Sequence, residues 1–281
     1  MKVTIWGCRG SLPTPGRDPV RYGGNTSCLE VELANGSVLV LDAGTGIREL
    51  GVKLERQNVR SIQLLLTHLH LDHVEGLRFF EPLWDEQVKI DIWGPPSPVV
   101  SLRERVARAF SPPLFPIEIA DVPARVNFID VPREQWVLDG ATLRADTIVH
   151  PGPTVGYRIE TGDGTLAYLP DHEPALTGSI SERSRDWISG ASLAAGADLL
   201  VHDAQFSEEE YSQRVGWGHS SSADAIAYGE AVGAERIVLF HHDPSHDDVW
   251  LDESEQRAQR LVASKGIVPT LAREGMALAP S

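Results

Sequence analysis

The segment Thr67–His73 (THLHLDH) limits the possible folds more than any other feature of this chain. It places four potential metal ligands within six residues, directly after the continuous apolar run from Ile62 to Thr67. Such a run predicts a buried strand. Imidazole and carboxylate groups suit zinc, manganese or iron. The fold must therefore bring a buried strand to an edge where the backbone turns around a metal ion.

The spacing within this segment divides its ligands into two pairs. His68 and His70 are two residues apart, so in an extended backbone they point the same way. Asp72 and His73 lie beyond the turn and can serve a second ion. The alternative is a scatter of surface histidines, since the chain has ten in 281 residues. Chance grouping of three histidines with an aspartate at this spacing is improbable, and we favour the metal site.

Three further candidate ligands each follow a predicted strand: His150, Asp171 and His241. Each alone is a weak signal, because a polar residue at a strand end is often only solvated. Together they place one candidate at each of three further strand ends, as expected for a site at the edge of a layered fold. His242 competes with its neighbour for the third position, and we prefer His241.

The apolar patterning predicts two sheets packed face to face with helices outside, in a single domain over residues 1–281. The hairpin signal Asn35-Gly36 joins two of the strands. We expect strands at 3–6, 27–33, 37–41, 62–67, 88–93, 126–131, 142–149, 155–161, 165–169, 198–202, 236–240 and 268–272, and helices at 47–57, 75–80, 98–110, 221–232 and 252–264.

Charge and cysteine content restrict the partners. Lysine and arginine total 25 against 40 acidic residues, a net charge of −15, which argues against broad nucleic-acid binding. A small anionic substrate at a positive metal site is still compatible with this charge. The two cysteines exclude a disulfide framework and indicate a reduced, cytoplasmic chain. We expect no secretory signal and no membrane segment.

The ligand candidates resemble the ligand pattern of the metallo-β-lactamase-fold hydrolases. This resemblance covers nearly the whole chain and implies an α/β fold, a four-layered αβ/βα sandwich with a dinuclear site at one edge. By the family pattern, one ion is held by three histidines, the other by an aspartate and two histidines, and a second aspartate bridges them. These ligands are, in order, His68, His70 and His150; Asp72, His73 and His241; and Asp171.

Two further pairs of segments look like the branch of that family that contains tRNase Z and phosphodiesterases. The first pair is 7–11 (GCRGS) with 22–27 (YGGNTS), and the second is 201–204 (VHDA) with 218–221 (GHSS). By this resemblance Asp203 orients His219, which faces the scissile phosphate. The tRNA-cleaving members more often carry glutamate at the position of Asp203. The alternative is a hydrogen-bonded pair that only fixes a loop.

Other polar residues near these motifs leave two interpretations open. The resemblance gives Asp42 the role of holding a ligand histidine by its free N–H, and a helix cap is the alternative. The early arginines Arg9, Arg17 and Arg21 either meet phosphate or are solvated. A polar cluster after His241 either supports the site or forms an acidic surface turn, which we favour; it consists of Asp243, His246, Asp247 and Asp248.

The expected activity is that of a dinuclear metal-dependent phosphodiesterase acting on a small substrate, with cyclic nucleotides first. We expect two close divalent ions, zinc or alternatively manganese or iron, to activate water and stabilise the phosphate. We expect Asp72 to be essential for hydrolysis and His219 to protonate the leaving oxygen. The alternatives are a tRNA 3′-end endonuclease, a lactone or ester hydrolase on the same site, and a non-catalytic metal-binding sensor. The resemblance also implies a homodimer.

Overall fold

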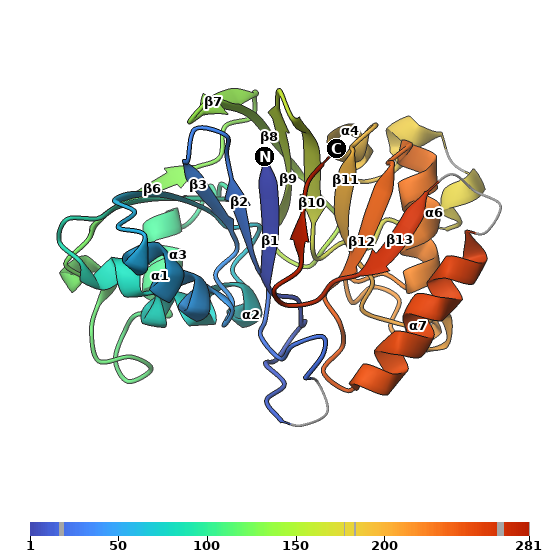
Figure 1. The fold of residues 1–281 in the computed structure, drawn as a ribbon, viewed down its shortest axis with the longest axis horizontal. Coiled ribbons are helices and arrows are strands. Elements are labelled where there is room, and N and C mark those ends of the chain that lie inside the picture. Colours follow the sequence, from blue (N-terminus) through green and yellow to red (C-terminus); the bar gives the residue numbers. More distant parts are fainter. Residues whose placement is uncertain (17–19, 177, 183, 263–266, 281) are drawn as a thin grey trace.

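Two seven-stranded sheets face each other at the centre of the computed structural model (Figure 1). The structure describes residues 1–16, 20–176, 178–182, 184–262 and 267–280. In spatial order the first sheet contains β14 (Ala277–Leu278), β1 (Lys2–Gly7), β2 (Cys28–Glu32), β3 (Val38–Leu41), β4 (Ser61–Leu65), β5 (Lys89–Gly94) and β6 (Arg125–Asp130). The second contains β13 (Val268–Leu271), β12 (Arg236–Phe240), β11 (Leu199–Asp203), β10 (Gly164–Leu169), β9 (Val155–Thr161), β8 (Ala141–Thr147) and β7 (Trp136–Leu138).

Helices cover the outer face of each sheet. On one side of Figure 1 lie α1 (Ile47–Arg56), α2 (Leu71–Val74) and α3 (Leu102–Ala107). On the other lie α4 (Ala191–Ala194), α6 (Ser222–Val232) and α7 (Asp248–Leu261), while α5 (Glu208–Ser212) follows β11. Three separate hydrophobic clusters fill the spaces between these layers, one between the sheets and one beneath each set of helices. This arrangement confirms the predicted four-layered α/β sandwich.

Several predicted boundaries need correction. The helix expected at 98–110 begins only after Ser101, whose side chain and that of Glu104 form a capping box, and it ends at Ala107. The helix expected at 75–80 is a 3₁₀ turn over Glu75–Phe79 that follows α2. The helix expected at 252–264 starts earlier, because Asp247 caps it by accepting a hydrogen bond from the Trp250 N–H, and positions 263 and 264 lie outside the described residues. Local capping, which the apolar period does not reveal, sets the start of the helices at Leu102 and Asp248.

Parallel strand pairing places the polar strand ends at one edge. In the first sheet β3 and β4 are parallel with Leu41 opposite Leu65. In the second, β10, β11 and β12 are parallel, with Leu169 opposite His202 and Asp203 opposite Phe240. The residues after these strands therefore meet at the same edge of the sandwich. β8 is antiparallel to β9 and ends at Thr147, so His150 follows it after a short turn.

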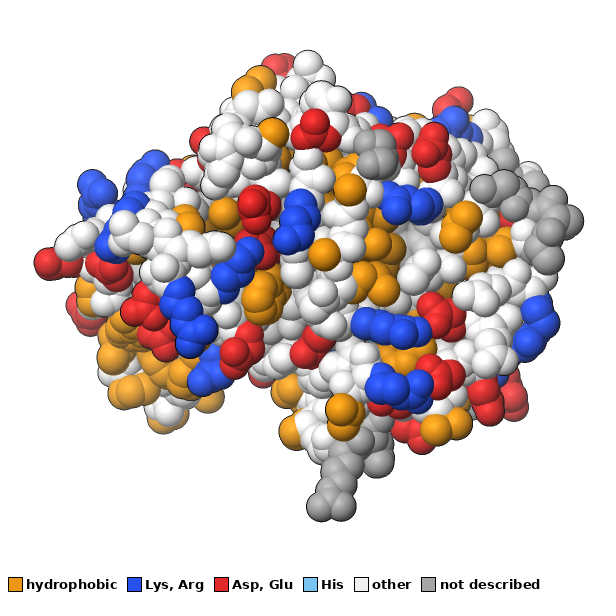
Figure 2. Space-filling model, viewed as in Figure 1, with side chains coloured by type: hydrophobic (Ala, Val, Ile, Leu, Met, Phe, Trp, Pro, Cys, Tyr) orange, Lys and Arg blue, Asp and Glu red, His pale blue; other side chains and the backbone are white. Residues whose placement is uncertain are grey.

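The surface carries charges of both signs on the face drawn in Figure 2, and both cysteines are buried. On the face drawn in Figure 2, lysine and arginine side chains are interspersed with aspartate and glutamate, and no broad area carries positive charge alone. Cys8 and Cys28 are buried free thiols. None of the helices found among the described residues combines the length and the apolar character that crossing a bilayer requires.

Candidate metal centre

Seven side chains from four segments of the chain converge at the shared edge of the two sheets. Two groups form, and within each group the ligand atoms lie within 4.8 Å of one another. The first group contains three histidines and an aspartate: His68, His70, His150 and Asp171. The second contains two aspartates and two histidines: Asp72, His73, Asp171 and His241. All seven ligand candidates predicted from the sequence are therefore brought together.

Asp171 belongs to both groups, and its two oxygens face different sides. Oδ2 lies 3.6 Å from the Nε2 atoms of both His68 and His150. Oδ1 lies 3.0 Å from His73 Nε2 and 3.3 Å from His241 Nε2. A carboxylate in this position can bridge two cations, one on each oxygen.

The electrostatics of the first group fit a metal ion. The buried His68 Nε2 atom has no hydrogen-bond partner among the described residues. Burial lowers the pKa of His68 well below its ordinary value and that of His150 to about 4, so both imidazoles are neutral at pH 7. Metal ligation requires this neutral form. The His150 Nδ1–H donates to the Gly218 carbonyl at 2.8 Å, which leaves Nε2 as the ligand atom.

The carboxylates in and around the second group favour a positive charge at this place. Burial opposes the charged imidazole of His73, but the carboxylates of Asp171, Asp42 and Asp72 raise its pKa well above the ordinary value. Burial likewise favours a neutral Asp171, yet the neighbouring imidazoles, His241 first, hold its pKa well below the usual range. A proton balances the acidic side chains in the metal-free chain. A divalent cation fits the same place.

Asp42 orients the second group from behind. Its Oδ2 atom lies 2.8 Å from His73 Nδ1, and its Oδ1 accepts the Thr67 N–H at 2.7 Å. The Tyr168 hydroxyl donates to Oδ2 at 3.0 Å. The residue that precedes α1 is Gly46, so Asp42 does not cap that helix. The geometry is that of a carboxylate holding a ligand histidine by its free N–H.

The structure separates the two adjacent histidines. His241 Nε2 points to the carboxylates of the second group and lies 3.2 Å from Asp72 Oδ2. His242 is buried with Nε2 bonded to the Ala272 carbonyl at 2.9 Å, away from the ligands. His241 has a positive φ of 65°, which directs successive side chains to different places.

His219 stands over both groups. Its Nδ1 atom lies 2.7 Å from Asp203 Oδ2. The ring is stacked on His241 at 4.9 Å between centroids and meets His150 edge-on at 5.0 Å. Burial opposes its charged form, but the carboxylate of Asp203 raises the pKa of His219 to about 9. In the metal-free chain the imidazole is therefore protonated at neutral pH, and its Nδ1 faces Asp203.

The remaining polar candidates have structural partners. The buried Arg9 guanidinium donates to the carbonyls of Gly23 and His246 at 2.8 and 2.6 Å. Arg21 pairs with Asp248 and Asp252 at 3.4 and 2.6 Å. Neither arginine joins the ligand groups. Arg17 lies outside the described residues.

The four polar residues noted after His241 also have such partners. His246 Nε2 lies 3.0 Å from Glu210, Asp247 caps α7, and Asp248 receives the ion pair from Arg21. Asp243 accepts from the Ser245 hydroxyl at 2.6 Å. The cluster therefore makes turn and cap contacts, and it differs from the acidic surface turn that we favoured because His246 and Asp248 are buried.

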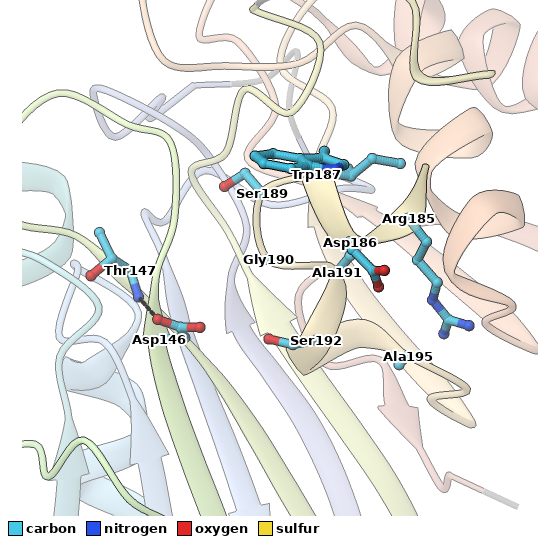
Figure 3. Close-up of a pocket in the computed structure, with 11 residues that line it drawn as sticks. Asp146, Thr147, Arg185, Asp186, Trp187, Ser189, Gly190, Ala191, Ser192 and Ala195 are labelled. Atoms are coloured by element: carbon cyan, nitrogen blue, oxygen red, sulfur yellow. Dashed lines mark hydrogen bonds between the residues drawn. The ribbon is translucent and has the colours of Figure 1, made fainter. Parts of the chain in front are cut away.

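A separate cavity of about 620 Å³ lies beside the end of β8 (Figure 3). The indole of Trp187, which is 82% exposed, and the carboxylates of Asp146 and Asp186 line it. One of its lining residues is Ser189, whose hydroxyl oxygen accepts the Val149 N–H at 2.9 Å. The residue before His150 is thereby anchored, while the cavity itself is not lined by the ligand groups.

The sequence analysis missed contacts made by the backbone of the early loop. The Ser11 N–H donates to Asp72 Oδ2 at 2.7 Å, and Ser11 adopts a positive φ of 62°. A Cβ on Gly10 would lie 2.4 Å from the ring of His241, so only glycine fits there. The glycines of residues 7–11 are a signal for such close approach, but they do not indicate which ligand is approached.

The chain belongs to the β-lactamase superfamily, since the model of the Beta-lactamase superfamily domain matches residues 38–242. It is 27% identical over 271 residues to Ribonuclease Z of Mycobacterium sp. (strain KMS), covering 87% of this chain and 85% of that relative. Its fold is similar to that of the metallo-β-lactamase fold protein YhfI from Bacillus subtilis, with a TM-score of 0.69, 19% identity and coverage of 99% and 98%. It is also similar to a diphosphatase from the PhnP family, with a TM-score of 0.68, 20% identity and coverage of 99% and 96%.

These similarities confirm the predicted family and its tRNase Z and phosphodiesterase-like branch. The protein is a metal-dependent hydrolase of the metallo-β-lactamase fold, and its clustered histidines and aspartates are suited to divalent metal ions.

Proposed function

We propose that the protein hydrolyses a small phosphodiester, with a cyclic nucleotide as the preferred candidate substrate. Two divalent ions, with zinc as the preferred candidate, would be held by the two ligand groups. His68, His70 and His150 would hold one ion. The second would be held by Asp72, His73 and His241, with Asp171 between the two. Both groups use nitrogen and carboxylate oxygen, the donor set that suits zinc, manganese or iron.

The observation that carries this proposal is the His219–Asp203 pair. A protonated imidazole, fixed at Nδ1 and stacked over the ligands, has its second nitrogen available for a leaving oxygen. A phosphodiester with an alkoxide leaving group requires this proton, because an alkoxide is a poor leaving group.

Each element of the chain then has a chemical task. When bound, two divalent ions supply an activated water at neutral pH and neutralise charge on the phosphoryl oxygens. His219 holds a proton at its free nitrogen and transfers it to the leaving oxygen, while Asp203 keeps the ring oriented. The Ser11 N–H and Asp42 fix Asp72 and His73, respectively.

A tRNA 3′-end endonuclease is the second candidate, because the Mycobacterium relative is named Ribonuclease Z and matches most of this chain. The net charge of −15 and the mixed charges in Figure 2 favour a small substrate over a polyanion.

Two further candidates are less well supported. A lactone hydrolase on the same metal centre has less need of the His219–Asp203 pair. A non-catalytic sensor would not require a complete set of seven ligands beside a protonated histidine.

A substrate panel with zinc-loaded protein tests the proposal. It contains 3′,5′- and 2′,3′-cyclic nucleotides, bis-p-nitrophenyl phosphate, a tRNA precursor and a lactone. The Asp72→Ala variant, purified in parallel, identifies activity that belongs to this centre, and Glu209→Gln, which changes an exposed carboxylate, is the matched control. Hydrolysis of a cyclic nucleotide supports the proposal. Cleavage of the tRNA precursor or the lactone alone would replace it with the corresponding alternative.

We further propose a single domain, a homodimer and a cytoplasmic location. The buried free thiols of Cys8 and Cys28 are compatible with a reducing compartment. Light scattering during size-exclusion chromatography tests the dimer. We expect a mass near 61 kDa, which is twice the 30.7 kDa of the chain.

A further inference from the structure

Glu173 occupies an unusual position two residues after Asp171. It is 1% exposed, and its carboxylate accepts three hydrogen bonds from the segment that leads to His219. The Gly216 N–H donates to Oε1 at 2.7 Å, the Tyr211 hydroxyl to Oε1 at 3.0 Å, and the Gly218 N–H to Oε2 at 2.7 Å. These three donors are neutral, so the carboxylate acts as the charged acceptor of a backbone clamp.

The clamp extends from Gly218 to a metal ligand. The N–H of Gly218 donates to Glu173 Oε2 at 2.7 Å, and the carbonyl of the same residue accepts the Nδ1–H of His150 at 2.8 Å. Gly218 has a φ of 91°, and a Cβ there would lie 2.2 Å from Pro151 Cδ and 2.5 Å from His150 Nδ1. The contact therefore requires glycine, and its position depends on what holds its N–H.

The backbone of Glu173 makes a second connection to the same ligand. Its N–H donates to the carbonyl of Val149 at 2.9 Å, directly before His150. One buried residue thus joins the segment that carries His150, the segment that carries Asp171 and the segment that carries His219. Contacts 43 and 45 residues apart in the sequence hold these segments together.

We propose that Glu173 is a positioning residue, whose carboxylate fixes the backbone of Gly218 on its N–H side and thereby orients His150, which the Gly218 carbonyl contacts, and His219, which follows Gly218 in the chain. The inference rests on the proposed function for its kinetic consequence, but not for its effect on metal binding. A carboxylate is needed because both oxygens face N–H or O–H donors. The amide of glutamine would direct its own N–H group at one of them, which leaves a buried donor without an acceptor.

The test is the Glu173→Gln variant, with Glu209→Gln as the matched control that removes an exposed carboxylate nearby. We expect Zn²⁺ affinity, measured by competition with a chromogenic chelator, to fall about tenfold to hundredfold, in line with losses of groups that orient metal ligands. The kcat for a substrate with an alkoxide leaving group should fall by a similar factor with KM little changed. Bis-p-nitrophenyl phosphate should be affected less, because its leaving group needs no proton.

Wild-type Zn²⁺ affinity and wild-type kcat in Glu173→Gln would overturn the proposal. So would equal losses on both substrates together with a lower melting temperature of the metal-free protein, which is the signature of a merely structural residue. If Glu173→Gln does not fold, Tyr211→Phe removes one donor from the same carboxylate, and an unchanged Zn²⁺ affinity there would overturn the proposal. If the wild type cleaves no phosphodiester, the proposed function fails, while the Zn²⁺ measurement still decides the role of Glu173.

Discussion

Replacing His219 by alanine should separate substrates by their leaving groups. The structure fixes the ring by its 2.7 Å contact with Asp203 and by stacking on His241, and the Asp203 carboxylate favours the protonated ring. Loss of a positioned general acid lowers the rate about 10²- to 10⁴-fold, which is about 3–5 kcal/mol of transition-state stabilisation. That loss is expected for the ribose alkoxide of a cyclic nucleotide. It should be far smaller for p-nitrophenolate, which departs without a proton.

The assay compares kcat on 3′,5′-cyclic nucleotide and on bis-p-nitrophenyl phosphate with zinc-saturated enzyme. Asp203→Asn should give a weaker form of the same pattern, because it only misorients the imidazole. His246→Ala is a matched control, since it removes a different buried histidine whose partner is the carboxylate of Glu210 at 3.0 Å. It should reduce thermal stability without distinguishing the substrates.

Equal losses on both substrates in His219→Ala, together with a lower melting temperature, would refute this reasoning. They would show that the Asp203 contact fixes a loop, and they would remove His219 from the mechanism even if the metal centre is correct.

Three further perturbations test the surroundings of this histidine. Asp72→Ala should abolish hydrolysis while circular dichroism shows an intact fold, since Asp72 serves the sheet edge and not the core; activity within tenfold of the wild type at limiting metal would count against this role. Asp42→Asn should release His73 Nδ1 and thereby lower metal affinity or activity about tenfold to hundredfold. Isothermal titration calorimetry measures the metal affinity, and an unchanged affinity would contradict this role of Asp42. Burial lowers the pKa of His202 to about 4, so this histidine contributes stability above its unfolded pKa that is lost as the pH falls toward 4. We expect this residue to lower the free energy of unfolding by about 2 kcal/mol at pH 5 relative to pH 7.5. Urea unfolding of the metal-free protein measures this, and a His202→Asn variant whose free energy of unfolding depends on pH as in the wild type would disprove it.

The sheet edge could be predicted because its signals are local. The apolar run before Thr67 and the ligands directly after it occupy one continuous segment, and parallel strands bring their carboxyl ends together. The same argument located Asp171 and His241 after β10 and β12. The prediction was less well founded where the chain turns between the strand and the ligand. His150 is the example, because β8 ends at Thr147 and not at 149.

Other features depend on backbone geometry that composition does not specify. A carboxylate after a strand fits both a helix cap and a histidine partner, and only the position of Gly46 before α1 and the contact with His73 decide for Asp42. The choice between His241 and His242 likewise depends on a positive φ at the first of them.

Glu173 could not be recognised from the sequence, since a single glutamate usually lies on the surface and the partners of its carboxylate are 38, 43 and 45 residues away. The short helix α5 was missed for a similar reason. It has five residues and no buried side chain, so it shows no apolar period, and its capping box is its main local signal.

The central claim is that two ions share one carboxylate, and it is tested most directly by a crystal structure of the zinc-loaded protein with anomalous data. We predict two metal ions per chain about 3.5–4 Å apart, with Asp171 between them. A fully loaded protein that holds one ion, with Asp72 and His73 turned away from it, would contradict the account.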